Sequence, residues 1–533
     1  MQMVMWSVLG IPTALALGSM AAPRSPVVRH TPAVAAAVVL MGGLAAFALT
    51  PAGQSAAGGL LRVDALTAYL LCVVGAVAVV STGGATTAEP NGRFSALMCL
   101  FLAAMSLAAL ADNLGVLWVA IEATTITTAF LVAHGGGRHG LEAAWKYVIL
   151  GSIGVAIALL GIVLVYAATG ESATLSLAQL ADQPLLAPDI ARVGLALTAL
   201  GLATKAGLAP MHSWLPDAHS QAPPQVSGLM SGVLLAVAFC AILRIKVISD
   251  AALGPELMQT LLTVAGLLSL TLAAFLILTQ RNYKRMLAYS SIEHMGILAL
   301  GAAVGGTLAY TAVLVHILGH GVTKAGLFVV AGRILRASGT HDIRGVHSLL
   351  TLRPSLGRPW LVGTAALLGL PPFVLFFTEV AIIVAGYQRG HLLMTSLALV
   401  LLLLLFVGIS RHVLDMALTS HDSRTAHALG ADPATARQRA VVMTALGSVA
   451  ALTLLLWPLR EALAAAVAVL EVKRRPEDAD ALFNSVRLAV LERTGLGLDD
   501  IAYALSPGLP RTTSGKLQRG RAREIYEAGE FSA

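Results

Sequence analysis

Long apolar runs, separated by short polar or glycine-rich segments, dominate the pattern of this chain. A helix needs roughly 20 apolar residues to cross the hydrocarbon core of a bilayer, and about fourteen stretches of that kind are present. The pattern therefore predicts an all-α polytopic membrane protein with about fourteen transmembrane helices. The expected spans are residues 4–22, 32–50, 65–83, 94–111, 114–133, 145–168, 191–210, 225–248, 258–280, 288–305, 308–336, 359–386, 391–409 and 441–460.

Composition supports this prediction and divides the chain in two. Of the 533 residues, 57% are hydrophobic and 12% are charged. From about residue 471 the sequence takes on an ordinary soluble composition, beginning with the charged run from Glu471 to Pro476. We therefore expect a transmembrane domain over residues 1–470 and a soluble tail over residues 471–533.

The net charge of +7 would suggest nucleic acid as the partner of a soluble protein, but here it is better explained by topology. Basic residues gather after odd-numbered spans, as at Arg24, Arg138, Lys284 and Arg411. Because cytoplasmic loops of membrane proteins are enriched in lysine and arginine, this bias predicts an N-terminus outside the cytoplasm. The chain is expected in the plasma (inner) membrane of a cell, as a multi-pass protein.

Ionisable residues lie inside several of the apolar spans. Glu122, Lys205, Lys324 and Glu379 are all within such spans, and Lys146 is at the start of one. A charge at bilayer depth costs at least about 2.5 kcal/mol, so each of these residues is a candidate functional site. Two simpler readings stay open: Glu122 and Lys205 could be a packing ion pair, and Lys146 could be a lysine that reaches the membrane surface beside Glu142.

Histidines extend this polar set. His294 starts one span, next to Glu293, and His316, His320 and Lys324 follow one another at four-residue spacing, which keeps them near one face of a helix. The HILGH segment lacks the glutamate of the HExxH zinc motif and has no third ligand nearby in sequence, so no metal is expected. The three cysteines form no ligand-spaced pair, and no nucleotide-binding loop is present, so no cofactor is expected either.

Prolines interrupt two spans close to these charges. Pro210 follows Lys205, and Pro371 and Pro372 precede Glu379. Proline frees backbone carbonyls, and irregular backbone at membrane depth is tolerated only where it lines a cavity or is buried in protein. Two discontinuous helices are therefore expected, each beside a buried charge.

Three motifs resemble a known family. TKAGLAPMHSWLPDAHSQAPPQVSGLMSGVLL (204–235), QRNYKRMLAYSSIEHMGI (280–297) and HGVTKAGLF (320–328) are similar to the antiporter-like subunits of respiratory complex I and of multisubunit sodium/proton antiporters. WVAIEATTITTAFLVA (118–133) and LEAAWKYVILGSIG (141–154) resemble, more narrowly, hydrogenase-4 component F. The resemblance covers nearly all of residues 60–420. It implies fourteen helices, two inverted five-helix repeats, discontinuous helices at Pro210 and Pro371, and no cofactor.

The resemblance also implies roles for single residues. Glu122 matches the family's glutamate on the fifth helix, Lys205 the lysine on the broken seventh, and Glu379 the charged residue on the broken twelfth, while His294, His320 and Lys324 fall where the central polar axis continues. The family's usual lysine on the eighth helix falls at Ala236, which leaves a gap in the implied proton path.

The tail resembles a different family. Residues 509–519, LPRTTSGKLQR, look like the C-terminal motif of adenylate-forming acyl-CoA and acyl-AMP ligases, in which the lysine matching Lys516 assists adenylation. The resemblance covers about the last sixty residues and lacks the large ATP-binding domain. We interpret the tail as a fused remnant or a docking piece.

The expected function is proton translocation by a membrane subunit of a hydrogenase-4 or formate hydrogenlyase-type complex. Such a subunit has no redox site of its own and would work with other membrane subunits and a nickel–iron hydrogenase or related redox module, not with nucleic acid. The expected relay is Glu122, Lys146, Lys205, His294, His320, Lys324 and Glu379. Two alternatives stay open: a true complex I or sodium/proton antiporter subunit, and a membrane anchor that does not pump.

Overall fold

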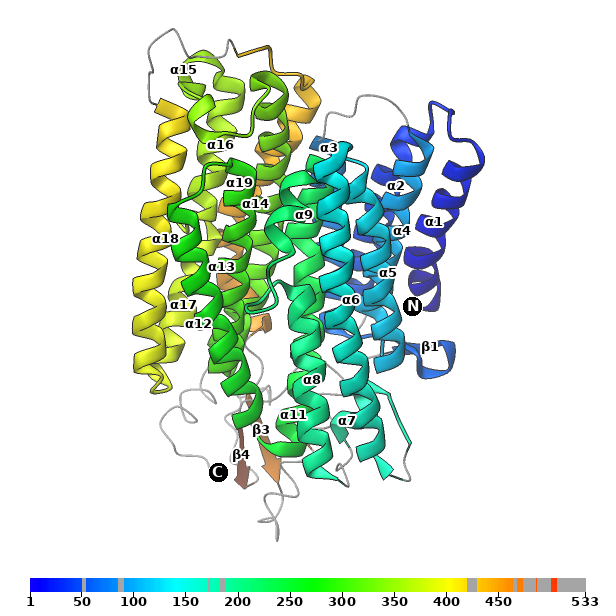
Figure 1. The fold of residues 1–533 in the computed structure, drawn as a ribbon. Coiled ribbons are helices and arrows are strands. Elements are labelled where there is room, and N and C mark those ends of the chain that lie inside the picture. The colour runs from blue at the N-terminus through cyan, green and yellow to red at the C-terminus, as the bar shows by residue number, and fades with distance from the viewer. Residues whose placement is uncertain are drawn as a thin grey trace, which may run out of the picture.

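Helices running side by side make up almost the whole molecule. The computed structural model describes residues 1–49, 54–84, 91–170, 173–182, 187–418, 429–463, 467–472, 486 and 500–505. The first helices lie at one side of the bundle and α18 lies at the other, with α13 and α14 between them (Figure 1). The α-helices are α1 (Gln2–Ala21), α2 (Thr31–Leu49), α3 (Ala65–Gly84), α4 (Gly92–Leu110), α5 (Leu114–Ala133), α6 (Gly137–Ala168), α7 (Leu177–Asp182), α8 (Pro188–Ala206), α9 (Leu215–Gln221), α10 (Pro224–Leu229), α11 (Leu235–Leu253), α12 (Glu256–Leu278), α13 (Tyr283–Val304), α14 (Gly306–Ser338), α15 (Leu349–Leu352), α16 (Pro354–Leu367), α17 (Val374–Gln388), α18 (Leu392–Leu418) and α19 (Ala436–Leu463).

Eleven helical spans in the described part of the chain are long and apolar enough to cross a membrane. The predicted all-α polytopic membrane protein is confirmed, and helices occupy every span that the apolar pattern marks. The total of fourteen crossings and the two inverted repeats stay predictions.

Two small sheets accompany the helices. Strands β1 (Gln54–Ala56) and β2 (Leu61–Val63) form an antiparallel hairpin, and β3 (Val467–Val472) pairs in parallel with β4 (Asp500–Leu505). The expected domain boundary at residue 470 therefore falls inside β3. The ligase-like motif of residues 509–519, including Lys516, lies outside the described residues.

The first helix break separates α8 from α9. Gly207 adopts a φ of +71°, the left-handed conformation that ends a helix without steric cost to glycine, and Pro210 follows in the non-helical segment. The indole Nε1 of Trp214 donates to the freed carbonyl of Thr204 at 2.8 Å. A backbone group released by the break thus has a protein partner, as the bilayer interior requires.

The second break lies between α16 and α17 and contains Pro371 and Pro372. Gly369, with a φ of +60°, follows the end of α16, and the hydroxyl of Thr453 on α19 donates to the carbonyl of Pro372 at 2.8 Å. Both interrupted helices that the prolines predict are therefore present in the fold.

A third irregularity has no signal in the sequence. Between α10 and α11, residues Met230–Leu234 form one turn of π-helix inside what reads as a continuous apolar span. Gly232 in this turn packs against α14 so closely that an added Cβ would lie 2.7 Å from the carbonyl oxygen of Gly321. Such turns occur frequently at functional sites.

Glycines set the close packing of α6 against α8, the helix that carries Lys205. A Cβ added to Gly201 would lie 2.4 Å from the backbone nitrogen of Ala158 and 2.5 Å from the carbonyl oxygen of Gly154. Both obstacles are backbone atoms, which cannot rotate away. Small residues at such contacts let membrane helices approach closely and gain dispersion energy.

A buried ion pair ties α11 to the start of α3. The guanidinium of Arg244 contacts both carboxylate oxygens of Asp64, at 3.0 and 3.2 Å, and also donates to the hydroxyl of Thr67 at 2.8 Å. Burial alone would raise the pKa of Asp64, but the charge of Arg244, with hydrogen bonds from Thr67 and Arg244, holds that pKa below its usual value. The pair is therefore charged at neutral pH.

We expect Gly201→Ala to destabilise the fold by about 1–3 kcal/mol, because the new methyl group meets backbone on α6. Gly10→Ala on α1 is the matched control, since nothing lies within 4 Å of its added Cβ. Thermal unfolding of both purified variants would measure the difference. Equal midpoints for the two variants would contradict the close packing of α6 and α8.

Candidate functional site

Helices at the centre of the bundle carry most of the candidate residues. The apolar windows of α13 and of the α10–α11 segment are 100% buried, and that of α14 is 94% buried. Lys205, His294 and Lys324 are each fully buried, and His316 and His320 lie beside them in the interior. The polar stripe predicted on α14 therefore faces protein rather than lipid.

The first group of polar residues joins α5, α6 and α8. Glu122 on α5 accepts hydrogen bonds from Ser152 at 3.0 Å and from Thr125 at 3.2 Å. On α6, the hydroxyl of Tyr147 accepts from the ammonium of Lys205 at 3.2 Å, and the same ammonium lies 4.5 Å from the centre of the tyrosine ring. Tyr147 thus contacts Lys205 through both its hydroxyl and its aromatic face.

Glu122 and Lys205 interact over a distance instead of forming a contact pair. They are near enough for a coulombic interaction, yet they are absent from the ion pairs within 4.0 Å among the described residues. Lys205 occupies the last turn of α8, where the unpaired carbonyls of a helix end favour a positive charge. The two groups therefore form no direct salt bridge, and the alternative that their attraction serves only packing stays open.

The second group joins α13, α14 and α17. On α14, the ammonium of Lys324 donates to the carbonyl of Leu287 at 2.5 Å and to the hydroxyl of Ser290 at 2.6 Å, both on α13. One turn earlier on α14, the ring of His320 lies 4.7 Å from that of His294. Lys324 and His320 thus both face α13.

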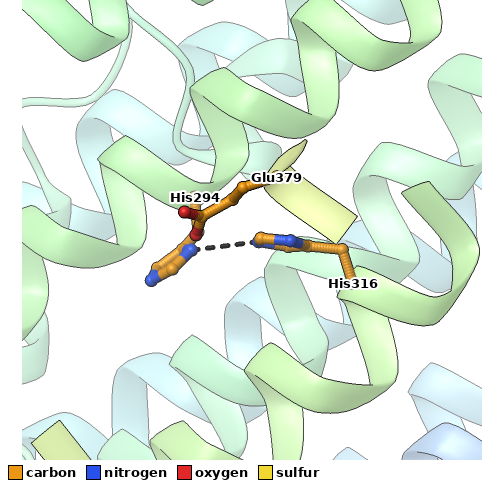
Figure 2. Close-up of side chains that lie close together, drawn as sticks. All are labelled: His294, His316 and Glu379. Carbon is orange, nitrogen blue, oxygen red and sulfur yellow. Dashed lines mark hydrogen bonds between the residues drawn. The ribbon is translucent and has the colours of Figure 1, made fainter. Parts of the chain in front are cut away.

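His294, His316 and Glu379 converge at the end of this second group (Figure 2). Nδ1 of His294 and Nε2 of His316 are hydrogen bonded at 3.0 Å, and a carboxylate oxygen of Glu379 lies within 4.8 Å of the histidine nitrogens. On the other side of its ring, His316 bonds through Nδ1 to the hydroxyl of Thr378 at 2.9 Å. A hydrogen-bonded histidine pair beside a carboxylate is an arrangement that can hand a proton from one group to the next.

His219 on α9 occupies the space between the two groups. It is fully buried, and apart from a backbone contact with Leu215, one turn earlier on α9, its ring nitrogens have no hydrogen-bond partner in the described part of the chain. Its ring lies 5.9 Å from that of Trp214 and 6.0 Å from that of Phe328, and it is near enough to Lys324 for a coulombic interaction. Buried polar groups of this kind are satisfied by internal water in folded proteins.

Lys146 lies apart from both groups. Its side chain is 48% exposed and pairs with Glu142 at 2.8 Å and with Asp217 of α9 at 3.2 Å, while Arg285 pairs with the other oxygen of Asp217 at 3.1 Å. The structure therefore places Lys146 in an ion cluster at the end of the helices, two residues along α9 from His219.

Several polar residues of the site were not selected from the sequence. Lys284, which the charge pattern assigned to a loop, is instead buried at the start of α13 and donates to the carbonyl of Ala222 at 2.9 Å. Tyr147 and Thr378 are neutral and give no charge signal. Glu293 and His219 carry a signal, being ionisable residues within or beside apolar spans, but only the fold brings them next to the candidate groups.

Comparison with known proteins agrees with the polytopic membrane fold. The model of the NADH:quinone oxidoreductase/Mrp antiporter transmembrane family matches residues 111–405. A hydrogenase-4 component F homolog from Methylacidiphilum infernorum is 38% identical over 318 residues, which are 58% of this chain and 66% of that relative. An NADH-quinone oxidoreductase subunit N from Rubrobacter xylanophilus is 34% identical over 70% of this chain and 78% of its own length.

A solved structure shows the same architecture. A chain of the membrane-bound sulfane sulfur reductase, an archaeal respiratory membrane complex, superposes with a TM-score of 0.78 at 25% identity, covering 86% of this chain and 96% of that one. The fold is that of an antiporter-like membrane subunit. The chain belongs to the NADH:quinone oxidoreductase/Mrp antiporter family, which confirms the resemblance found in its motifs.

Tyr147→Phe keeps the ring that faces Lys205 but removes the hydroxyl. We expect a loss of stability of about 1.5–3 kcal/mol, because a buried ammonium loses a hydrogen-bond partner. Tyr166→Phe, on the exposed face of the same helix, is the matched control. Chemical unfolding in detergent would measure both, and a Tyr147→Phe variant as stable as the control would exclude the contact.

Proposed function

We propose that the chain is the proton-translocating antiporter-like subunit of a hydrogenase-4-type or complex I-related redox complex in the plasma membrane. The observation that carries the proposal is a series of ionisable groups through the middle of the bundle. Its ends, Glu122 on α5 and Glu379 on α17, are partly buried, and the lysines and histidines between them are fully buried. Inserting such a series into a membrane costs free energy. Apolar residues of similar size would pack at least as well, so packing alone does not explain these groups.

In the first half of the proposed path, Lys205 holds the proton. Its charge is stabilised by Tyr147, by the carbonyl end of α8 and by the coulombic field of Glu122. A desolvated lysine that loses a nearby carboxylate charge releases its proton more readily. A change in the charge state of Glu122 would therefore drive the proton of Lys205 toward the centre.

In the middle of the path, His219 replaces the lysine that the family usually carries on the eighth helix. Ala236, at the aligned position, is buried and apolar and offers no proton acceptor. His219, on α9, lies near Lys324, and apart from a backbone contact with Leu215 its ring nitrogens have no partner among the described residues. An imidazole linked by water to lysines on either side can accept a proton at one nitrogen and release another from the second.

In the second half, the proton passes from Lys324 through His320, His294 and His316 to Glu379. Glu293, beside His294, is near enough to Lys324 to act on it as Glu122 acts on Lys205. Lys146 and its ion cluster would form one mouth of the path, on the side that the basic loops predict to be cytoplasmic.

Energy for the movement would come from partner subunits. The sequence offers no nucleotide loop or cysteine ligand set, and the named relatives are subunits of hydrogenase-4 and of NADH-quinone oxidoreductase. By that likeness the partners are other membrane subunits and a nickel–iron hydrogenase or related redox module. The tail from about residue 471 would be a separate soluble piece that does not take part in ion movement.

A non-pumping membrane anchor is the second candidate, and one observation favours it. Ala236, where the resemblance places the family's lysine, belongs to the continuous apolar core, which supports an interrupted path. The two candidates differ in whether the buried groups on either side of Ala236 exchange protons.

Lys205→Ala should lower coupled proton movement by about 100-fold or more, because it removes a group that carries the proton. The control is Arg192→Ala, an exposed basic residue on the same helix. Proton uptake by membrane vesicles that contain the assembled complex would be measured at equal amounts of folded protein. Unchanged uptake in the Lys205 variant would remove it from the path.

His219→Leu should likewise reduce proton uptake by about 100-fold, and adding Ala236→Lys to that variant should restore part of it. The restored lysine would supply, from α11, the proton carrier that was lost from α9. Ala236→Leu, in place of the lysine, is the matched control and should restore nothing. The anchor candidate predicts instead that His219→Leu has no effect and that Ala236→Lys lowers the yield of folded protein, since a charge in a dry apolar core costs about 3 kcal/mol or more.

A further inference from the structure

Three metal-binding side chains meet at one point although they are far apart in the sequence. His294 on α13, His316 on α14 and Glu379 on α17 each offer one ligand atom, and these atoms all lie within 4.8 Å of one another (Figure 2). The sequence argument against a metal at His316 was the lack of a third ligand nearby along the chain. The fold supplies two further ligands from other helices.

We propose that His294, His316 and Glu379 form a binding site for a divalent transition-metal ion of the zinc class. Two imidazoles and one carboxylate, with a water molecule in the fourth position, are a common donor set of open zinc sites. Imidazole nitrogen suits zinc, copper and nickel, whereas magnesium and calcium prefer a shell of oxygen atoms. The donor set therefore also disfavours sodium, a hard cation, as the ion at this point.

The distances require little movement. In a tetrahedral zinc site the ligand atoms are about 3.4 Å apart, because each lies about 2.1 Å from the ion. Nδ1 of His294 and Nε2 of His316 are already 3.0 Å apart. The three ligand atoms lie within 4.8 Å of one another, so a shift of up to about 1.4 Å in the carboxylate of Glu379 would bring the third ligand into range.

Hydrogen bonding already orients His316 for this role. The hydroxyl of Thr378 donates to the carbonyl of Leu375 at 2.9 Å, so it accepts from Nδ1–H of His316. That assignment leaves Nε2 of His316 unprotonated and directed at the cluster, where it accepts from Nδ1–H of His294. Metal binding would move that proton to Nε2 of His294 or release it, so that both facing nitrogens could bind the ion. Metal-binding histidines are usually held in this way, with the second ring nitrogen donating to a protein oxygen.

Charge and access also fit a divalent ion. Glu293 lies near enough to Glu379 for a coulombic interaction, so two carboxylates would balance the two positive charges. Glu379 is only partly buried, and Leu370 to Pro372, in the helix break before α17, are exposed. The cluster therefore has one ligand close to an exposed segment, whereas its two histidines lie on the buried helices α13 and α14.

A bound ion would stop proton transfer here, because it would occupy the nitrogen lone pairs through which His294 and His316 exchange a proton. This consequence rests on the proposed function, while the binding site itself does not. The ion would therefore act as an inhibitor from within the path.

Binding can be measured on the full-length chain in lipid nanodiscs with Zn²⁺ in calorimetry and Co²⁺ in absorption spectroscopy. We expect one ion per chain and the visible absorption of tetrahedral Co²⁺. His294→Gln and His316→Gln should each weaken Zn²⁺ binding by roughly 100-fold or more. The matched control is His412→Gln on α18, a buried histidine whose Nε2 bonds to the carbonyl of Ile277 at 2.9 Å; it should bind as the wild type does.

Zn²⁺ binding that survives His316→Gln, or that His412→Gln weakens equally, would overturn the site. X-ray absorption of the Zn²⁺-loaded wild type tests the site without any variant, so misfolding cannot affect the result. Two imidazole ligands are expected, and a shell made only of oxygen atoms would overturn the proposed site. Proton uptake with and without Zn²⁺ then separates the two proposals. If the protein binds Zn²⁺ but takes up no protons, the result counts against the proposed function only. If proton uptake is unchanged when Zn²⁺ fills the site, the proposal that the ion inhibits transfer is overturned.

Discussion

The helix breaks and the polar centre of this fold depend on one constraint: each ionisable group inside the membrane protein needs a hydrogen-bond or charge partner. Each charge at the centre of a helix costs about 2.5–3.5 kcal/mol, so four of them together cost about 10–14 kcal/mol, which is comparable with the whole net stability of a typical domain. Hydrogen-bond and aromatic partners of the buried lysines offset this cost. Lys205 has the hydroxyl and ring of Tyr147, and Lys324 has Ser290 and the carbonyl of Leu287.

The helix breaks follow from the same constraint. Ending α8 at Gly207 places the carbonyl end of a helix beside Lys205, while Trp214 and Ser269 bond to backbone groups that the break exposes. The π-helical turn before α11 similarly distorts a helix where it passes the centre of the bundle. Irregular backbone is therefore concentrated around the charges, and the regular helices further out, such as α1 and α18, form the lipid-facing shell.

The sequence was sufficient for the charged residues and the prolines, because an ionisable or helix-breaking residue stands out against an apolar run. Lys205, Lys324, Glu379 and both breaks were predicted on that basis. The sequence was insufficient where only the three-dimensional fold determines whether a polar side chain is buried. His219 is a single histidine in a polar loop motif until α9 turns it into the core, and Lys284 reads as a loop charge until Ala222 accepts its hydrogen bond. The π-helical turn changes only the spacing of the backbone hydrogen bonds, so the pattern of apolar residues does not reveal it.

The central claim is that protons cross from the Lys205 group to the Lys324 group through the region of His219. A cryo-electron microscopy map of the assembled complex in lipid, at a resolution that shows ordered water, tests it most directly. Proton transfer along this route requires ordered water at His219 that continues toward Lys205 on one side and Lys324 on the other. A region packed with apolar side chains and empty of water density would contradict it.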